Sequence, residues 1–103
     1  MSGNKLERDF QASLIKELKT RFKGCMILKL DPSSPGIPQG IPDLLILFKN
    51  KWAALECKKS KKASKRPNQK YYVDKMNEMS YSSFIYPENR EEILNGLAQA
   101  FRD

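Results

Sequence analysis

Two apolar runs separated by a short polar turn constrain the fold of this chain more than any other feature. The runs cover residues 44–48 and 52–55, and the turn between them contains the letters KNK. Apolar segments of this length, joined by a few polar residues, predict the two strands of a β-hairpin. The second run, WAAL, is apolar on both faces, which favours a central strand that is buried from both sides.

The rest of the chain predicts helices and short strands around this hairpin. Residues 4–23 are expected to form a helix that ends at Gly24, because apolar residues recur at every fourth position. Residues 25–30 and the segment SSFIYP are interpreted as strands, and residues 31–42, rich in proline and glycine, as irregular structure. A helix from Pro67 to about Ser80 and a last helix over residues 88–101 complete the order αβββαβα. The apolar stripes of the first and last helices contain Leu6, Phe10, Leu14, Leu18, Phe22, Ile93, Leu94, Leu97, Ala98 and Phe101.

The composition excludes several kinds of protein and of chemistry. A chain of 103 residues has room for one core, so residues 1–103 are expected to form a single α/β domain. Because histidine is absent, neither a Ser-His-Asp or Cys-His nucleophilic site nor a histidine-ligated zinc site can be built. Cys25 and Cys57 are interpreted as small buried apolar residues. Catalysis would have to use carboxylates, lysines, hydroxyls or a metal held by oxygen atoms.

No segment of the sequence predicts a membrane protein or a secreted one. No apolar run approaches the roughly 20 residues that span a bilayer. The N-terminal residues MSGNKLERDF lack the hydrophobic segment of a signal peptide. The expected location is therefore the cytoplasm in which the protein is made.

The positive charge is concentrated in one segment. Residues 58–70, KKSKKASKRPNQK, contain seven basic residues and no acidic one, which accounts for the whole net charge of +7. Such a block predicts phosphate contacts, although a solvated loop that improves solubility is the alternative. The candidate DNA-binding residues are Lys59, Lys61, Lys62, Lys65, Arg66 and Lys70.

Acidic residues flank the two strands of the predicted hairpin. Asp43 precedes the first run, and Glu56 closes the second, with Lys58 two residues later. Side chains two apart on a strand share a face, so Glu56 and Lys58 should project together and Cys57 in the opposite direction. Converging carboxylates repel unless a cation lies between them, and Mg²⁺ commonly takes one or two carboxylates. The alternative is a surface ion pair between Glu56 and Lys58.

Two further polar residues are predicted on the inner faces of helices. Glu7 falls in the middle of the apolar stripe of the first helix, where a carboxylate is costly unless it is paired or bound to metal. Gln11 shares that face, whereas Asp9 points to solvent. Attraction of an acid to the helix dipole is the alternative explanation for Glu7. Gln69 shares the inner face of its helix with core residues, as a site residue or as a satisfied core amide.

These segments together resemble the PD-(D/E)xK nuclease superfamily. GIPDLLIL and WAALECKK are similar to its signature, with Asp43, Glu56 and Lys58 at the acidic and lysine positions. LERDFQASLIKEL and NQKYYVDKM are similar to the flanking helices of the VRR-NUC branch. Small phage Holliday-junction resolvases have a comparable layout. The resemblance covers nearly the whole chain, in the same order.

The resemblance implies a fold, a metal site and a set of catalytic residues. The fold would be a restriction-endonuclease-like αβββαβ core, with a mixed central sheet flanked by helices and an added C-terminal helix. Mg²⁺ or Mn²⁺ would be held by Asp43, Glu56 and the backbone carbonyl of Cys57, with Glu7 joining directly or through water. Lys58 would position or activate the attacking water or stabilise the developing phosphate charge, and Gln69 matches the helix glutamine of the family.

The function favoured by the sequence is a metal-dependent DNA endonuclease of the Holliday-junction resolvase type. The chain has no spare domain for reading bases, so branched DNA is the expected substrate. Two symmetric nicks in a junction would require a homodimer. The alternatives are a nuclease of other specificity and a non-catalytic basic DNA-binding module, and RNA binding has too few aromatic signals to favour it. A phage-encoded protein of this kind would work in the cytoplasm of its host cell.

Overall fold

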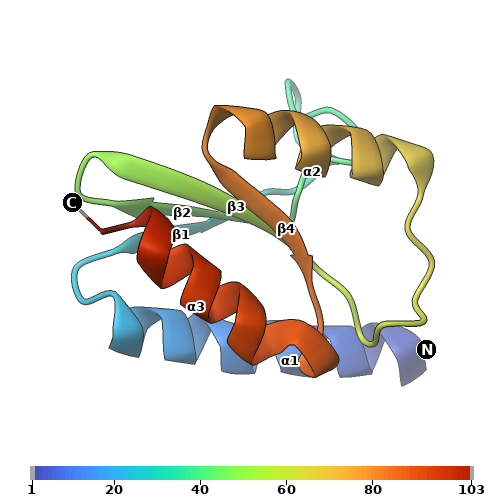
Figure 1. The fold of residues 1–103 in the computed structure, drawn as a ribbon. Coiled ribbons are helices and arrows are strands. Elements are labelled where there is room, and N and C mark those ends of the chain that lie inside the picture. Colours follow the sequence, from blue (N-terminus) through green and yellow to red (C-terminus); the bar gives the residue numbers. More distant parts are fainter. Residues whose placement is uncertain (1, 103) are drawn as a thin grey trace.

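A mixed four-stranded sheet with helices on both faces forms the centre of this α/β protein (Figure 1). The structure is a computed structural model that describes residues 2–102. The strands β1 (Met26–Lys29), β2 (Leu44–Phe48), β3 (Lys51–Cys57) and β4 (Tyr81–Ile85) lie side by side in that order. The first three are antiparallel neighbours, whereas β3 and β4 are parallel.

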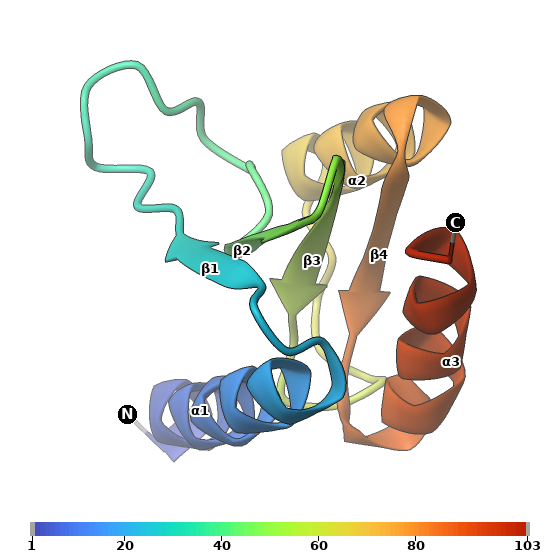
Figure 2. The same ribbon diagram turned by 90° about the vertical axis from the view of Figure 1, so that its left-hand side faces the viewer.

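In residues 2–102, three α-helices cover the sheet, one on one face and two on the other (Figures 1 and 2). The helix α2 (Pro67–Met79) lies on one face and connects the parallel strands β3 and β4, as a parallel pair requires. The helices α1 (Ser2–Arg21) and α3 (Arg90–Ala100) lie on the opposite face. None of the helices in residues 2–102 has the length and apolar character that crossing a membrane requires.

The main core lies between the sheet and the pair α1 and α3. Alternate residues of β2 and β3 point into it, because Leu44 pairs with Leu55 and Ile46 pairs with Ala53. The neighbouring Ala54 is also fully buried, on the face that α2 covers, so β3 is the central strand expected from WAAL. The other buried members of this core are Phe10, Leu14, Leu18, Phe22, Cys57, Ile85, Ile93, Leu94, Leu97 and Phe101.

The order of elements predicted from the sequence is confirmed, with changes at several boundaries. The hairpin strand β3 continues to Cys57, two residues beyond the apolar run. The last helix begins at Arg90 rather than residue 88, after a 3-10 turn over Pro87–Asn89. The Asn89 amide fixes this turn, because its Oδ1 accepts the Tyr86 N–H at 2.9 Å and its Nδ2 donates to the Phe84 carbonyl.

Two packing expectations require correction, those for Leu6 and for Cys25. Leu6 was expected in the apolar stripe of α1, but its side chain is 59% exposed. The inner face predicted for α3 is confirmed, because this last helix packs into the core through the fully buried Leu94 and Leu97. Of the two free cysteines, Cys57 is fully buried and Cys25 is only partly buried.

The proline-rich segment, residues 31–42, forms a chain of turns that leaves β1, projects beyond the sheet and returns to β2 (Figure 2). Its backbone hydrogen bonds run from the N–H groups of Ser34, Ile37 and Ile41 to carbonyls three residues earlier. Gly40 has a φ of +93°, and an added Cβ there would lie 2.8 Å from the Asn68 backbone. Glycine is therefore required where this segment meets the beginning of α2.

Candidate functional site

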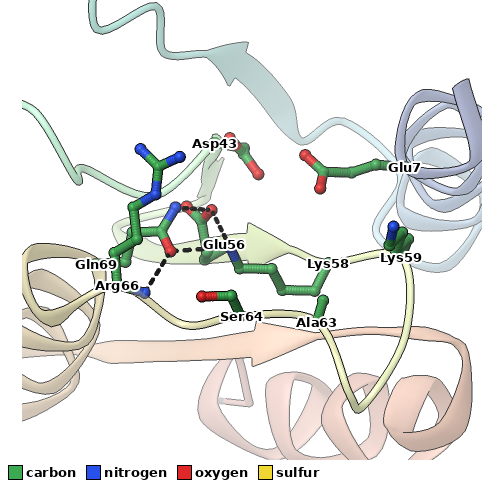
Figure 3. A pocket seen from close by; sticks show the side chains of 9 residues that line it. All are labelled: Glu7, Asp43, Glu56, Lys58, Lys59, Ala63, Ser64, Arg66 and Gln69. Atoms are coloured by element: carbon green, nitrogen blue, oxygen red, sulfur yellow. Dashed lines mark hydrogen bonds and ion pairs between the residues drawn. The ribbon is translucent and has the colours of Figure 1, made fainter. Parts of the chain in front are cut away.

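The five candidate catalytic residues line one pocket, of about 460 Å³ (Figure 3). They come from four places: α1, the residue before β2, the end of β3 and the first turn of α2. The five are Glu7, Asp43, Glu56, Lys58 and Gln69. The basic segment provides the other lining residues, which are Lys59, Ala63, Ser64 and Arg66.

Asp43 is held in place by the backbone of the neighbouring strands. Its Oδ2 accepts the N–H of Cys57 at 2.9 Å, across the hairpin. Its own carbonyl accepts the N–H of Leu30 at 2.8 Å, which continues the pairing of β1 with β2. The carboxylate is thus fixed by two strands rather than by a loop, as a precise ligand site requires.

Glu56 is buried with one carboxylate oxygen that has no hydrogen-bond partner. The residue is 3% exposed, and its Oε2 accepts a hydrogen bond from Nε2 of Gln69 at 3.1 Å. Its Oε1 is buried without a partner, and in the described residues the only other such side-chain atom is Oγ of Ser82. Buried polar atoms in native proteins nearly always have a partner, so a cation or a water is expected to contact Oε1.

One amide orders the Lys58 amine and the Glu56 carboxylate. Nζ of Lys58 donates to Oε1 of Gln69 at 2.8 Å, and the Arg66 N–H donates to the same oxygen at 3.1 Å. The Gln69 Nε2 then donates to Glu56, so the orientation of the amide is fixed by all three contacts. Both explanations of Gln69 therefore apply, because the amide is satisfied and also lies in the site.

The expected alternative of a surface ion pair between Glu56 and Lys58 is wrong. Lys58 is only 8% exposed and Glu56 is 3% exposed, so both charged groups are taken out of water. Their Nζ to Oε2 distance is 3.9 Å, at the limit of an ion pair. Keeping both groups charged here would cost several kcal/mol, which a pair at this distance does not recover fully. These residues are arranged for something other than stability.

Burial and repulsion by neighbouring acids raise the pKa values of Asp43 and Glu56. The pKa of Glu56 is raised to about 8 by burial first and then by the charges of Asp43 and Glu7, against the attraction of Lys58. The pKa of Asp43 is raised to about 6 by burial and by Glu7, although the Cys57 N–H opposes the rise. A single lysine charge therefore does not compensate the acids, and a divalent cation would.

Glu7 reaches the same pocket from the other side. Figure 3 shows its carboxylate pointing from α1 toward Asp43. The helix begins at Ser2 and has no acidic residue in its first turn, so attraction to the helix dipole does not explain Glu7. Within residues 2–102, however, no three acidic or sulfur side chains stand close enough to hold an ion unaided.

The side chain of Cys57, next to Glu56, belongs to the core rather than to the pocket. Burial, followed by the charge of Asp43, raises the pKa of its thiol, while the side chain of Gln11 hydrogen-bonds to it. The thiol thus stays protonated and unreactive. Gln11 is inward as expected, but its role is to satisfy this thiol. Cys57 does not line the pocket, and its carbonyl as a metal ligand stays a prediction.

The basic segment is divided between the pocket and the protein surface. Lys59 and Arg66 line the pocket, and Figure 3 shows them at opposite ends of it. Lys65 instead lies over the rings of Phe84 and Tyr86, at 5.5 and 5.3 Å from their centroids.

The remaining predicted DNA-binding residues lie outside this pocket. Nζ of Lys70 pairs with Asp74 at 2.8 Å, one turn along α2. The backbone N–H of Lys61 donates to Oε1 of Glu88 at 3.0 Å, which anchors the segment near α3. The side chains of Lys61 and Lys62 are exposed.

Sequence reasoning missed several residues of the site. Ala63 and Ser64 line the pocket but lie in an irregular segment, where no periodicity indicates which side chain points inward. Only their position inside a basic block next to Lys58 was available as a signal. The hydrogen bond from the Lys61 N–H to Glu88 was equally unpredictable, since it joins residues 27 positions apart.

Comparisons of the chain with protein-family models, with curated proteins and with solved structures gave no match. The functional argument therefore depends on the residues and on the geometry of this site.

Proposed function

We propose that this protein is a metal-dependent DNA endonuclease of the PD-(D/E)xK type, related to the VRR-NUC branch. One observation carries the proposal: Glu56 is buried with an unpartnered oxygen, in a pocket that also contains Asp43 and Glu7. A structural carboxylate would have its oxygens satisfied, whereas a metal ligand keeps one for the ion.

The donor atoms in this pocket fit Mg²⁺ or Mn²⁺. Carboxylate oxygens are the ligands that hard divalent cations prefer, and Mg²⁺ keeps several waters beside one or two carboxylates. Asp43 and Glu56 would be the direct ligands, with the Cys57 carbonyl and Glu7 as further ligands, Glu7 directly or through water. The ion would lower the pKa of a water and neutralise charge on the phosphate.

The amine of Lys58 is the proposed proton donor or hydrogen-bond donor at the reacting phosphate. Gln69 holds it at 2.8 Å within the pocket, so its direction is set before substrate binds. A preorganised cation aimed at developing charge lowers the barrier without reorganisation. Lys59 and Arg66, at the two ends of the pocket, would bind the phosphates on either side of the one that is cut.

A non-catalytic DNA-binding module is the second candidate. The basic segment favours it, because seven positive charges without an acid attract any phosphate backbone. The buried acids oppose it, since carboxylates facing phosphates weaken binding and contribute nothing in return. Dependence on a divalent metal separates the two candidates.

The substrate is proposed to be branched DNA, cut by a homodimer as in a Holliday-junction resolvase. The basic segment would contact phosphates, which carry no sequence information, so recognition of DNA shape is favoured over recognition of a base sequence. Two symmetric cuts in a junction require two sites, which a two-fold dimer supplies. Light scattering at micromolar concentration tests the dimer, and a protein that stays monomeric on junction DNA would contradict it.

The test of function uses purified protein with end-labelled linear duplex, flap and four-way junction DNA. Each substrate is incubated with Mg²⁺, Mn²⁺, Ca²⁺ or a chelator. We expect internal cleavage with Mg²⁺ and Mn²⁺ only, faster on branched than on linear DNA. Binding without cleavage under every metal condition would favour the DNA-binding module instead.

A further inference from the structure

A second, smaller pocket adjoins the candidate metal site. Its volume is about 140 Å³, and it shares Asp43, Glu56, Arg66 and Gln69 with the larger pocket. The buried carboxylate with the unpartnered oxygen thus lies between two openings. The remaining walls of the small pocket are Pro32, Gln39, Gly40, Ile41 and Asn68.

The walls of this pocket are built before any ligand binds. Gly40 approaches Asn68 so closely that a Cβ would lie 2.8 Å from its backbone, so the proline-rich segment is packed on α2. The segment is also stiff, because proline recurs in it and successive turns are hydrogen-bonded. At its beginning, Oδ1 of Asp31 accepts the N–H and the hydroxyl of Ser33 at 2.9 and 2.8 Å.

The size and chemistry of the pocket fit one flat heterocyclic ring. A cavity of about 150 Å³ is known to hold a single benzene ring, and the volume here is about 140 Å³. Pro32 and Ile41 supply apolar surface, while Gln39 and Asn68 supply amides. An amide carries both a donor and an acceptor, which is the combination that the edge of a base presents. Arg66, which lines both pockets, provides the charge for a phosphate.

We propose that the small pocket holds the unstacked base of the nucleotide next to the phosphate that is cut, with Arg66 on the phosphate at the other side of that nucleotide. This inference rests on the nuclease function proposed above. A paired base cannot enter so small a pocket without leaving its duplex, which costs a few kcal/mol. The preferred substrate is therefore DNA with an unpaired nucleotide beside the cut, as in a flap, a bulge or the open centre of a branch.

The test compares cleavage of three DNAs of the same sequence with Mg²⁺. One is fully paired, one carries an unpaired nucleotide, and one carries an abasic residue in place of that nucleotide. In a series of substrates, the unpaired or abasic nucleotide is placed at successive positions on both sides of the mapped cut. At one position we expect the unpaired base to raise the rate about tenfold over both other substrates, since specific base contacts are worth that much.

Variants locate the effect in the small pocket. Gln39→Ala and Asn68→Ala should each reduce the rate ratio of unpaired to abasic substrate severalfold, whereas Gln99→Ala, exposed on α3, should keep it. A second readout without cleavage uses 2-aminopurine at the same position in Ca²⁺, where fluorescence should change on binding to the wild type and less so with Asn68→Ala.

The outcomes separate the two proposals. Equal rates on the unpaired and abasic substrates at every position, or a ratio unaffected by Gln39→Ala and Asn68→Ala, would overturn the base pocket and leave the nuclease intact. Absence of cleavage of all substrates with both Mg²⁺ and Mn²⁺ would overturn the nuclease and the base pocket with it.

Discussion

At the residue scale, the site depends on the one amide of Gln69. Its oxygen receives the Lys58 amine and the Arg66 N–H, and its nitrogen donates to Glu56. One oxygen of Glu56 is thereby occupied and the other is left for an ion. The arrangement costs stability in the absence of a cation, because like charges and burial both raise the carboxylate pKa values.

The raised pKa values predict how stability depends on pH. The pKa of Glu56 is raised from 4.5 to about 8, so between these values the folded protein holds a proton that the unfolded chain has released. Stability of the metal-free protein from this residue therefore falls as pH rises from about 4.5 to about 8. Thermal melts of the wild type and of Glu56→Gln test this prediction. The Tm of the variant should rise relative to that of the wild type as the pH increases across this range.

The same shifts predict competition between protons and metal. Mg²⁺ must displace the Glu56 proton below pH 8, so it should bind at least about tenfold more weakly at pH 6 than at pH 8. At about 100 times its Kd, Mg²⁺ should raise the Tm by on the order of 10 °C. Differential scanning fluorimetry measures both. An equal rise in Asp43→Asn would show that Mg²⁺ binds elsewhere.

Removing the Lys58 amine should impair catalysis without unfolding the protein. We expect Lys58→Ala to lower the cleavage rate by roughly 100-fold or more, as loss of a proton donor or charge stabiliser does. Gln69→Ala should lower the rate with little change in DNA affinity, because it acts by positioning Lys58. Lys75→Ala, exposed on α2, is the matched control. A Lys58→Ala protein of full activity but lower Tm would make Lys58 structural.

At the element scale, strand ends position the proposed metal ligands, and the irregular segments form walls of the two pockets. Asp43 directly precedes β2 and Glu56 lies near the end of β3. These strands were predictable because their apolar runs and polar turn appear in consecutive residues. The inward position of Glu7 and Gln69 was predictable from helical periodicity alone. Leu6 was wrongly predicted to be buried. Periodicity gives the direction of a side chain along a helix, but it does not show how far the elements packed against that helix extend.

Long-range contacts account for what the sequence did not reveal. Lys65 lies over Phe84 and Tyr86, about twenty positions later in the chain, a contact that no local pattern indicates, and its contact with DNA stays a prediction. The small pocket requires the proline-rich segment to pack on Asn68, which no local pattern indicates. Local propensities determine elements, whereas such contacts depend on how the elements are placed.

The proline-rich segment allows a matched test of this packing. Gly36 and Gly40 have similar φ values of +87° and +93°, but an added Cβ meets nothing within 4 Å at Gly36 and the Asn68 backbone at Gly40. Gly36→Ala should cost about 1–2 kcal/mol of backbone strain, and Gly40→Ala should cost more because backbone must move. Urea denaturation measures the two free energies of unfolding. Equal losses would show that the segment does not pack on α2.

At the scale of the whole molecule, charge and shape converge at one end of the sheet. The basic segment runs past the ends of β3 and β4, beside the carboxylates, so phosphates attracted by the net charge of +7 arrive at the candidate site. The basic residues attract phosphates, whereas the buried carboxylates repel them. A cation bound to the carboxylates would remove this repulsion.

The salt dependence of DNA binding tests which lysines and arginines meet phosphate. Each phosphate contact contributes a slope of about −0.9 in log K against log salt for duplex DNA. The double variant of Lys59→Ala and Arg66→Ala, which removes both pocket ends, should reduce the magnitude of the slope by about 2 in metal-free buffer. The control changes Lys16 and Lys23, exposed on and just after α1. An unchanged slope would mean that the pocket ends do not touch DNA.

The most direct measurement is the initial rate of DNA cleavage in Mg²⁺ by the wild type and by Asp43→Asn and Glu56→Gln. These substitutions keep shape and remove one ligand charge each, so DNA binding should persist or tighten at low salt. We expect wild-type cleavage that disappears with a chelator, and a loss of at least about 100-fold in each variant. Full Mg²⁺-dependent cleavage by either variant would contradict the assignment of these carboxylates to the metal site.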